Sequence, residues 1–451
     1  MSKIKFFLGL WAGKFFMFFY SLLGQRKNDK PGFAAYKFDQ DILKHIKKPK
    51  LTIVVTGTNG KTTTCSVIAQ ILKSYGFTVA YNDWGANYPA GQARCLLDAV
   101  NIFNLSTKDA AIIEADEATL ETTLPKIKPN YLFITNLGQD SPLRNADPLY
   151  IRKHIVEALN LTKDLKTVIN ADDPISADLG TLTSKTIYFG ADNMHTDASA
   201  NHIYTVCPKC GMTPLYRYVN MNHYGDFKCP KCNNTSPKKD FNLISVDNIK
   251  NTIVVNDFEY SVPSAMLFNA YNFCGVIALL KDVGLTSVDI NSGFKKVVLP
   301  ASRNIYKKVN NIEIIALASK GQNPSACSAT FASIATDDSN KQVVLMLDED
   351  FKDTKKTESA EWIYDTAFEP LLKDNIEKII VAGERHLDHK IQLLMCGANP
   401  NKLVCIQEQK KVVDYINYDS KSKIYILFDF EDLEYAKYCV EEIAKRIMEG
   451  K

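Results

Sequence analysis

The sequence predicts an α/β protein with two α/β domains, and three features of the chain lead to that fold class. Short apolar runs rich in β-branched residues alternate with helical stretches from residue 51 to about residue 190. A second alternating block follows between residues 343 and 448. A small cysteine module interrupts the pattern at residues 207–232. In the first block, near-continuous apolar strands separated by helices are typical of a parallel sheet covered on both faces.

The first element in chain order is an apolar run. Residues 6–24 are FFLGLWAGKFFMFFYSLLG and follow Lys3 and Lys5. The charges are those of a signal peptide, but the segment has no small-residue cleavage site. The length is that of a transmembrane helix, but Lys14 would then lie in the middle of the span. An apolar helix that lies on a membrane surface, or packs on the body of the protein, is the third possibility. We expect residues 1–50 to form this helix and a polar, basic connector that starts at residue 25.

Strand and helix signals then define two blocks. Val67, Ile68, Ile71 and Leu72 lie at helical spacing within residues 62–75. Strand and helical signals resume from residue 243 to about residue 299. We therefore predict a central domain over residues 51–300 and a C-terminal, Rossmann-like α/β domain over residues 301–451, with a last helix at residues 431–448. The expected strands are Leu51–Thr56 and residues 77–81, 110–115, 131–135, 167–170, 186–189, 343–347, 379–382, 403–406 and 424–428.

A glycine-containing loop, Thr-Gly-Thr-Asn-Gly-Lys-Thr at residues 56–62, joins the first strand to the next helix. Glycine lets the backbone wrap a phosphate, and the helix N-terminus offers free N–H groups and a positive dipole end. Lys61 is expected to reach the β- and γ-phosphates of ATP, and the Thr62 hydroxyl to bind Mg²⁺. Two residues separate Gly57 from Gly60, where the general phosphate-loop pattern has four.

The cysteine module consists of two Cys-x-x-Cys pairs, Cys207 with Cys210 and Cys229 with Cys232, separated by eighteen residues. This spacing predicts a tetrahedral Zn²⁺ site in a ribbon inserted at residues 205–235. Four thiolates leave no position for water, so a structural role is expected. A pair of disulfides is the alternative, and an ATP-using protein in a reducing compartment disfavours it.

The overall charge gives no reason to expect a nucleic-acid partner. The chain has 54 basic and 51 acidic residues, which give a net charge of +3. The seven cysteines outside the module are scattered, and several lie in apolar runs, as buried free thiols do.

The segment TGTNGKTTT resembles the signature of the Mur ligase superfamily, and further segments resemble that family in the same order. They are NADDP at residues 170–174, the acidic stretch at residues 114–117 and FNAYN at residues 268–272. The resemblance implies a central ATPase domain in which Glu114 binds Mg²⁺ with Thr62. It also implies that Arg303 contacts the transferred phosphate or the ribose. The other implied ATP contacts are Thr58, Asn59, Gly60, Lys61, Thr62 and Thr63 at the phosphates and Asn269 and Asn272 at the adenine.

Within that superfamily the chain is similar to the ligase subunits of lipid II isoglutaminyl synthase. About fifty residues precede the phosphate loop, which leaves no room there for a UDP-binding domain. The zinc module, the segment EWIYD at residues 361–365 and Asn323-Pro324 point the same way. The resemblance implies ATP-dependent amidation of the α-carboxylate of D-glutamate in the lipid II stem peptide through an acyl phosphate, with Lys61 as a catalytic residue.

The same resemblance implies a partner and a location. A class I glutaminase subunit would supply ammonia, and an acidic residue of this chain, Asp353 or else Asp365, would complete the partner's catalytic triad. We expect a cytoplasmic protein at the inner face of the membrane that holds lipid II, with residues 6–24 contacting the membrane surface. Two stretches depart from the family: Gln139 stands where the family has Arg, and the acidic loop around Asp353 matches loosely.

Two other functions fit parts of the sequence. One is a Mur-like ligase that joins an amino acid to a carboxylate, against which the cysteine module and the EWIYD segment argue. The other is a catalytically weakened, nucleotide-binding homologue, against which the intact Lys61, Thr62 and Glu114 argue.

Overall fold

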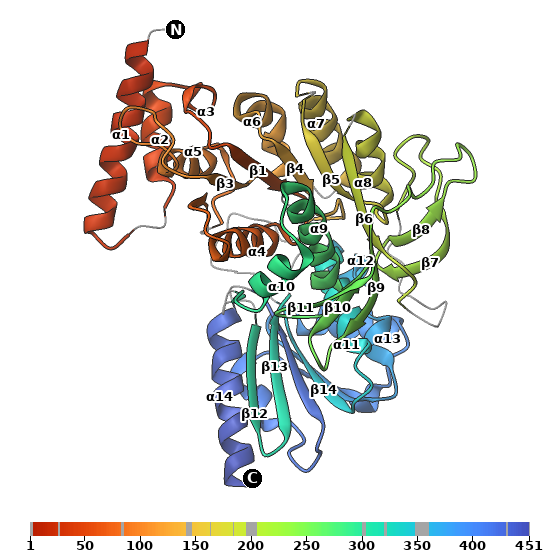
Figure 1. Cartoon of the computed structure of the whole chain (residues 1–451). Helices are drawn as coiled ribbons and strands as arrows, with labels where there is room; N and C mark the ends of the chain where they lie inside the picture. Colours follow the sequence, from red (N-terminus) through yellow and green to blue (C-terminus); the bar gives the residue numbers. More distant parts are fainter. Residues whose placement is uncertain are drawn as a thin grey trace.

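Two large β-sheets, one of nine strands and one of six, organise the chain in the computed structural model (Figure 1). The structure describes residues 3–25, 28–82, 85–140, 147–162, 164–183, 185–194, 205–299, 304–319, 323–347, 360–429 and 432–450. Arg303 and Asp353 lie outside these residues.

The nine-stranded sheet has the order β11-β10-β9-β6-β5-β4-β1-β3-β2. From β9 to β2 all neighbours are parallel, whereas β10 and β11 add an antiparallel edge. The strands are β1 (Leu51–Thr56), β2 (Val79–Tyr81), β3 (Ala110–Glu114), β4 (Tyr131–Ile134), β5 (Lys166–Asn170), β6 (Thr186–Ala191), β9 (Phe241–Asp247), β10 (Thr252–Val255) and β11 (Phe258–Ser261). The six strands predicted in this block are therefore present, and the antiparallel edge is additional.

Helices cover both faces of this sheet, because alternate residues of its strands are buried on opposite sides. Ile53 and Val55 belong to the core under α4, α9 and α10, and Val54 belongs to the core under the other helices. The helices are α4 (Lys61–Ser74), α5 (Pro89–Asp98), α6 (Leu120–Ile127), α7 (Pro148–Asn160), α8 (Pro174–Leu179), α9 (Leu267–Val283) and α10 (Ser287–Phe294), with the short 3-10 turns η1 (Glu117–Thr119) and η2 (Gly180–Leu182).

The N-terminal segment packs on this domain through three helices, α1 (Lys3–Leu22), α2 (Lys30–Phe38) and α3 (Ile42–His45). Gly13 lets α1 approach α5, since a Cβ there would lie 2.6 Å from Leu97 Cδ1. The predicted connector was wrong in part: Pro31 stands in the first turn of α2, where proline favours a helix start. Within the described residues no helix has the length and hydropathy needed to cross a membrane.

The six-stranded sheet has the order β12-β13-β17-β14-β15-β16, parallel except for the edge strand β12. Helix α14 (Leu433–Glu449) covers one face, and α11 (Pro324–Ala335), α12 (Glu361–Asp365) and α13 (His386–Met395) cover the other. The strands are β12 (Asn304–Val309), β13 (Ile312–Ala318), β14 (Lys341–Met346), β15 (Ile376–Ala382), β16 (Leu403–Ile406) and β17 (Lys423–Phe428), with the turns η3 (Glu369–Leu372), η4 (Pro400–Lys402) and η5 (Gln409–Asp414). The four strands and the last helix predicted here are present.

A separate two-stranded sheet follows β6 in the chain. It is the hairpin of β7 (Leu215–Met221) and β8 (Tyr224–Lys228), which joins neither large sheet (Figure 1). Its turn contains Asn222 at φ +51°, a left-handed conformation that asparagine adopts more readily than most residues.

Candidate functional site

The glycine-containing loop lies between β1 and α4 in a conformation that needs its glycines. Gly57 and Gly60 have φ values of +123° and +87°. A Cβ on Gly57 would lie 2.2 Å from Thr135 Oγ1, and one on Gly60 would lie 2.4 Å from Asn272 Nδ2. Any other residue at either position would be strained, so sequence and backbone agree on this loop.

Residues that follow β4 anchor the glycine-containing loop through hydrogen bonds. Asn136 accepts hydrogen bonds from Thr58 N at its carbonyl oxygen (2.9 Å) and from Asn59 N at its side-chain oxygen (3.1 Å). The Thr58 hydroxyl bonds to Gly138 (3.1 Å). No local pattern along the chain predicts these contacts, because the two segments are almost eighty residues apart and meet only when β1 pairs with β4.

Lys61, the first residue of α4, is largely buried, with 11% of its side chain exposed, and its ammonium lies 2.7 Å from Glu117 Oε1. Burial alone would lower the pKa of Lys61, but the carboxylates of Glu117, Glu114 and Asp140 outweigh it and raise that pKa. The lysine is therefore held as a cation at the mouth of the loop, where an anionic phosphate would be stabilised.

The two predicted Mg²⁺ ligands line one cavity. Thr62 is the second residue of α4, and Glu114 ends β3, the strand next to β1. Asn82 fixes Glu114 by accepting from its backbone N–H (2.8 Å) and donating to its carbonyl oxygen (3.0 Å). A hydroxyl and a buried carboxylate are oxygen ligands of the kind that Mg²⁺ prefers, so these residues fit the ion.

The cavity itself has a volume of about 400 Å³ and is lined by both large domains and by the β7–β8 hairpin. All described residues that were predicted to bind ATP line it: Thr58, Asn59, Gly60, Lys61, Thr62, Thr63, Asn269 and Asn272. The two asparagines lie in the first turns of α9, a helix that is apolar on most of its surface and almost wholly buried. The size and the lining match a pocket for a nucleotide.

The C-terminal domain closes the cavity through α11. Its N-cap residue, Asn323, exchanges two side-chain hydrogen bonds with Asn59 of the loop (3.2 and 3.3 Å). Asn323 Nδ2 also donates to Asp140 Oδ1 (2.7 Å). Nearby, Gln139 Nε2 donates to Asp365 Oδ2 (2.6 Å), so Asp365 lies at the junction of the two domains.

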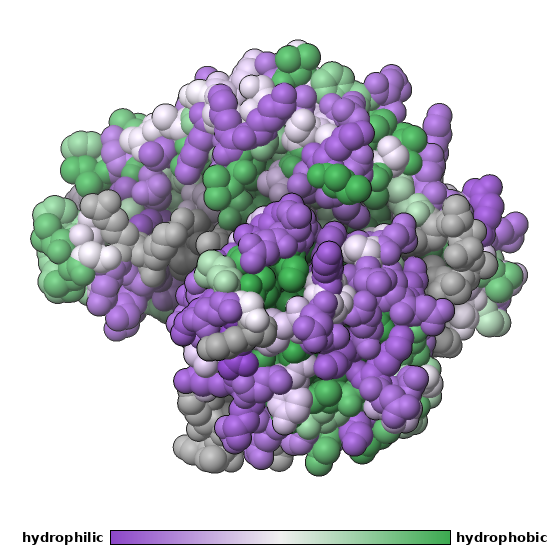
Figure 2. Space-filling view, turned by 90° about the horizontal axis from the view of Figure 1, so that it is seen from below, coloured by the Kyte–Doolittle hydropathy of each residue, from purple (hydrophilic) through white to green (hydrophobic). Residues whose placement is uncertain are grey.

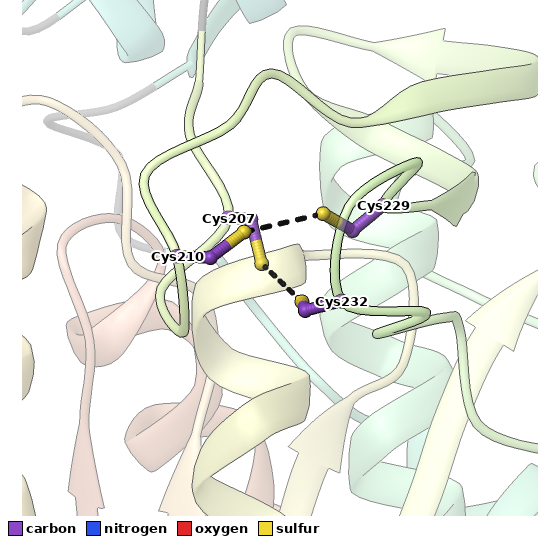
Figure 3. A group of neighbouring side chains, drawn as sticks. All are labelled: Cys207, Cys210, Cys229 and Cys232. Carbon is purple, nitrogen blue, oxygen red and sulfur yellow. Dashed lines mark hydrogen bonds between the residues drawn. The ribbon is translucent and has the colours of Figure 1, made fainter.

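The four predicted zinc ligands form one cluster (Figure 3). The sulfur atoms of Cys207 and Cys232 are 3.5 Å apart, and those of Cys210 and Cys229 are 3.4 Å apart. Both distances exceed the disulfide bond length of about 2.05 Å and approach the separation of about 3.8 Å between thiolates on one tetrahedral Zn²⁺. Backbone N–H groups of Cys232 and Lys231 lower the pKa of Cys229 to about 6, whereas burial raises the pKa of Cys207 to about 12. The thiolate that a metal requires is thus favoured at Cys229, and the case for a metal rests on the arrangement of the four sulfur atoms. The residues present therefore fit a zinc ion.

The fold and the loop define the class of the protein, an ATP-dependent ligase of the Mur type. The model of the Mur ligase middle domain matches residues 55–280, and that of the MurT ligase C-terminal domain matches residues 321–433. The chain therefore belongs to the Mur ligase family, in its MurT branch.

Individual proteins show the same relationship. The chain is 30% identical to a Staphylococcus aureus (strain COL) protein named lipid II isoglutaminyl synthase (glutamine-hydrolyzing) subunit MurT, over 82% of this chain and 83% of the relative. It is 28% identical to the Streptococcus pneumoniae protein of that name, over 94% of each. Among solved structures, a pseudomurein peptide ligase type C from Methanothermus fervidus has the same fold, with a TM-score of 0.68 and 22% identity over 90% of this chain and 81% of that one.

Proposed function

We propose that this chain amidates the α-carboxylate of D-glutamate in the stem peptide of lipid II, in peptidoglycan synthesis. The observation that carries the proposal is a shared cavity. Lys61, Thr62 and Glu114 line it from the central domain, and residues of the C-terminal domain line it as well. The nucleotide is expected to bind between the two. The names of the two MurT relatives supply the acceptor and the amide product.

The proposed chemistry has two steps. The carboxylate attacks the γ-phosphorus of ATP, and the bond between that phosphorus and the β-phosphate oxygen breaks. ADP departs, and the carboxylate becomes an acyl phosphate. Ammonia then attacks the acyl carbon, phosphate leaves with the bonding electrons, and ammonia's excess proton passes to solvent. Lys61 stabilises the negative charge on the phosphates. Thr62 and Glu114 would hold Mg²⁺, which would supply further positive charge against the phosphates. Alignment and charge neutralisation carry most of such a reaction.

We assign the supply of ammonia to a partner. At neutral pH nearly all free ammonia is protonated to ammonium, which has no free electron pair, so at low ammonium concentrations the reaction needs ammonia made close to the site. The relatives' name contains "glutamine-hydrolyzing", which supports a class I glutaminase subunit as the partner. Asp353 and Asp365 are the candidates for the acidic residue lent to that partner. The bond from Gln139 already engages one oxygen of Asp365, which favours Asp353 for this role.

A direct assay tests the acceptor and the reaction together. Purified protein with lipid II, ATP, Mg²⁺ and ammonium should form ADP and a stem peptide with an amide in place of the carboxylate, identified by mass spectrometry. The matched reaction contains amino acids in place of ammonium. Amide formation only with amino acids would show that the chain is a ligase that adds amino acids. Nucleotide binding without ADP formation would favour a catalytically weakened homologue.

We further propose that α1 brings the enzyme to the cytoplasmic face of the membrane that carries lipid II. Large apolar side chains recur every three or four residues along its exposed side: Ile4, Leu8, Trp11, Phe15, Phe18 and Leu22. Figure 2 shows apolar surface at the left margin, the side on which α1 lies in Figure 1. Residues 1–28 contain basic but no acidic residues, which suits an anionic lipid surface.

Vesicle flotation tests this location. The full-length protein should float with vesicles that contain phosphatidylglycerol, and Trp11→Ser with Phe15→Ser should reduce the bound fraction about tenfold or more. Equal flotation of both proteins, or a dimer that the double substitution dissociates, would show that α1 serves another partner.

A further inference from the structure

The tip of the β7–β8 hairpin reaches the nucleotide cavity from outside both large sheets. Met221, Asn222 and Tyr224 line that cavity together with the phosphate loop and α11. The cysteine cluster lies at the opposite end of the hairpin, where Cys229 follows β8 directly. The inserted module therefore contributes part of the cavity wall.

The tip is fixed in place on three sides. Asn222 Nδ2 donates to the carbonyl oxygen of Ser325 in α11 (2.8 Å). His223 Nε2 lies 3.3 Å from Oδ1 of Asp173, the N-cap residue of α8. The Tyr224 ring packs on Tyr271 of α9, with 5.8 Å between ring centroids. These contacts place Asn222 between the central domain and the C-terminal domain.

Two polar atoms at this point lack a hydrogen-bond partner among the described residues: Asn222 Oδ1 and Ser325 Oγ. Their side chains are 3% and 0% exposed, and both residues line the cavity. A buried polar atom left unpaired costs about 1–3 kcal/mol, so a group that bonds to both atoms would bind favourably. An amide oxygen can only accept, and a serine hydroxyl can donate or accept.

The chemistry of the two atoms selects one end of ATP. Phosphate oxygens at neutral pH accept hydrogen bonds and do not donate them. The donors of ATP are the amino group of adenine and the ribose hydroxyls. We propose that Asn222 and Ser325 form a subsite for the nucleoside of ATP, in which Asn222 Oδ1 accepts a hydrogen bond from the base or the sugar. This subsite rests on the proposed use of ATP but not on the identity of the acceptor.

The subsite gives the inserted module a role in nucleotide binding. Asn222 belongs to the module, and Ser325 belongs to the C-terminal domain. A nucleoside that bonds to both would connect these two parts over the phosphate loop, so that binding and closure of the cavity are coupled.

Calorimetric binding of ADP to the full-length, metal-loaded protein tests the subsite without any turnover. Ser325→Ala removes a hydroxyl that is unpaired in the free protein, so it should leave thermal stability unchanged and weaken ADP binding about five- to tenfold. Asn222→Gly tolerates the left-handed backbone and should weaken ADP binding to a similar extent. Ser333→Ala is the matched control, because its hydroxyl is also buried and unpaired among the described residues of α11 but lies outside the cavity.

Three analogues distinguish the sources of the donor. Inosine diphosphate lacks the amino group, and 2′-deoxy-ADP and 3′-deoxy-ADP each lack one hydroxyl. The analogue without the recognised donor should bind the wild type more weakly and be unaffected by Asn222→Gly. Tripolyphosphate, which has no nucleoside, should bind all variants equally. Unchanged ADP affinity in both variants, or an equal loss for tripolyphosphate, overturns the subsite. Failure of the wild type to bind ADP would overturn the proposed use of ATP itself.

Discussion

The side chains of Asn59 and Asn323 exchange two amide hydrogen bonds, 3.2 and 3.3 Å long, between the phosphate loop and the N-terminus of α11. The residues are 264 positions apart and belong to the two different α/β domains. Asn323 also caps α11 by accepting from Ala326 N (2.8 Å). One residue thus begins the helix and joins the C-terminal domain to the loop.

Breaking this amide pair should impair closure of the cavity more than it impairs the fold. Asn323→Ser retains an oxygen that can cap α11 but cannot reach Asn59 with an amide. We expect kcat/KM for ATP to fall roughly fivefold or more, since one net hydrogen bond contributes about 1 kcal/mol. Asn59→Ala should lower it similarly, and the double variant should lose less than the sum of the two effects. Additive losses in this double-mutant cycle would contradict a direct coupling.

Removal of the loop cation should abolish phosphoryl transfer. Lys61→Ala should lower ADP formation by roughly 10³-fold or more, because the charge that develops on the phosphates loses its nearest buried cation. Lys73→Ala, an exposed lysine of the same helix, is the control and should behave like the wild type. Since Lys61→Ala leaves the buried Glu117 without its cation, adding Glu117→Gln should restore thermal stability but not ADP formation. Substantial ADP formation by Lys61→Ala would contradict the assigned role of the loop.

The parts of the fold with strong local signals were predictable from the sequence. The expected helix at residues 62–75 and α4 (Lys61–Ser74) differ by one residue at each end, because a glycine turn and a clear apolar period mark it. The antiparallel edges β10–β11 and β12–β13 were not predicted. Their turns use Asn256, Asn310 and Asn311 at positive φ, so Asn-Asp and Asn-Asn between apolar runs were hairpin signals that could have been recognised.

The residues of the candidate site also fall into two groups, those with a local sequence signal and those without one. The loop residues are contiguous and carry a motif, so they could be found in the sequence. Asn136, Asn222 and Ser325 come from three distant segments, and no spacing along the chain relates them. Parallel pairing, the inserted hairpin and the packing of the two domains bring them together, and those depend on long-range contacts. The importance of Asn323 was suggested only by its resemblance to a family motif.

Acid should destabilise the C-terminal domain through a buried histidine. His389 of α13 is 1% exposed, and its ring lies edge-on to Trp362 with 5.4 Å between centroids. Burial lowers the pKa of His389 to about 4, although Asp388 opposes this shift. Because the folded-state pKa of His389 lies below its unfolded-state value, the contribution of the neutral side chain to folding stability is complete above pH 6.5. That contribution is lost as the pH falls towards 4. The loss amounts to about 3 kcal/mol.

Urea unfolding at several pH values measures this effect. The free energy of unfolding should fall more steeply between pH 6.5 and pH 4.5 in the wild type than in His389→Gln, which cannot bind the proton. His386→Gln is the control, since that histidine lies on the same helix and is half-buried. Parallel pH profiles for the wild type and His389→Gln would contradict the prediction.

Loss of zinc should unfold the hairpin module and, through it, weaken nucleotide binding. The purified protein should contain one zinc ion per chain, and Cys229→Ser with Cys232→Ser should reduce the content to near zero, as measured by atomic emission. Metal binding supplies roughly 10–16 kcal/mol of apparent free energy in small zinc modules, so the double variant should also lose its cooperative unfolding transition in that region. Cys405→Ser, outside the cluster, is the control.

Because Asn222 stands at the tip of the same hairpin, the metal-free protein should bind ADP at least as weakly as Asn222→Gly does. A double variant that retains both zinc and ADP affinity would show that these thiolates neither bind the metal nor support the tip.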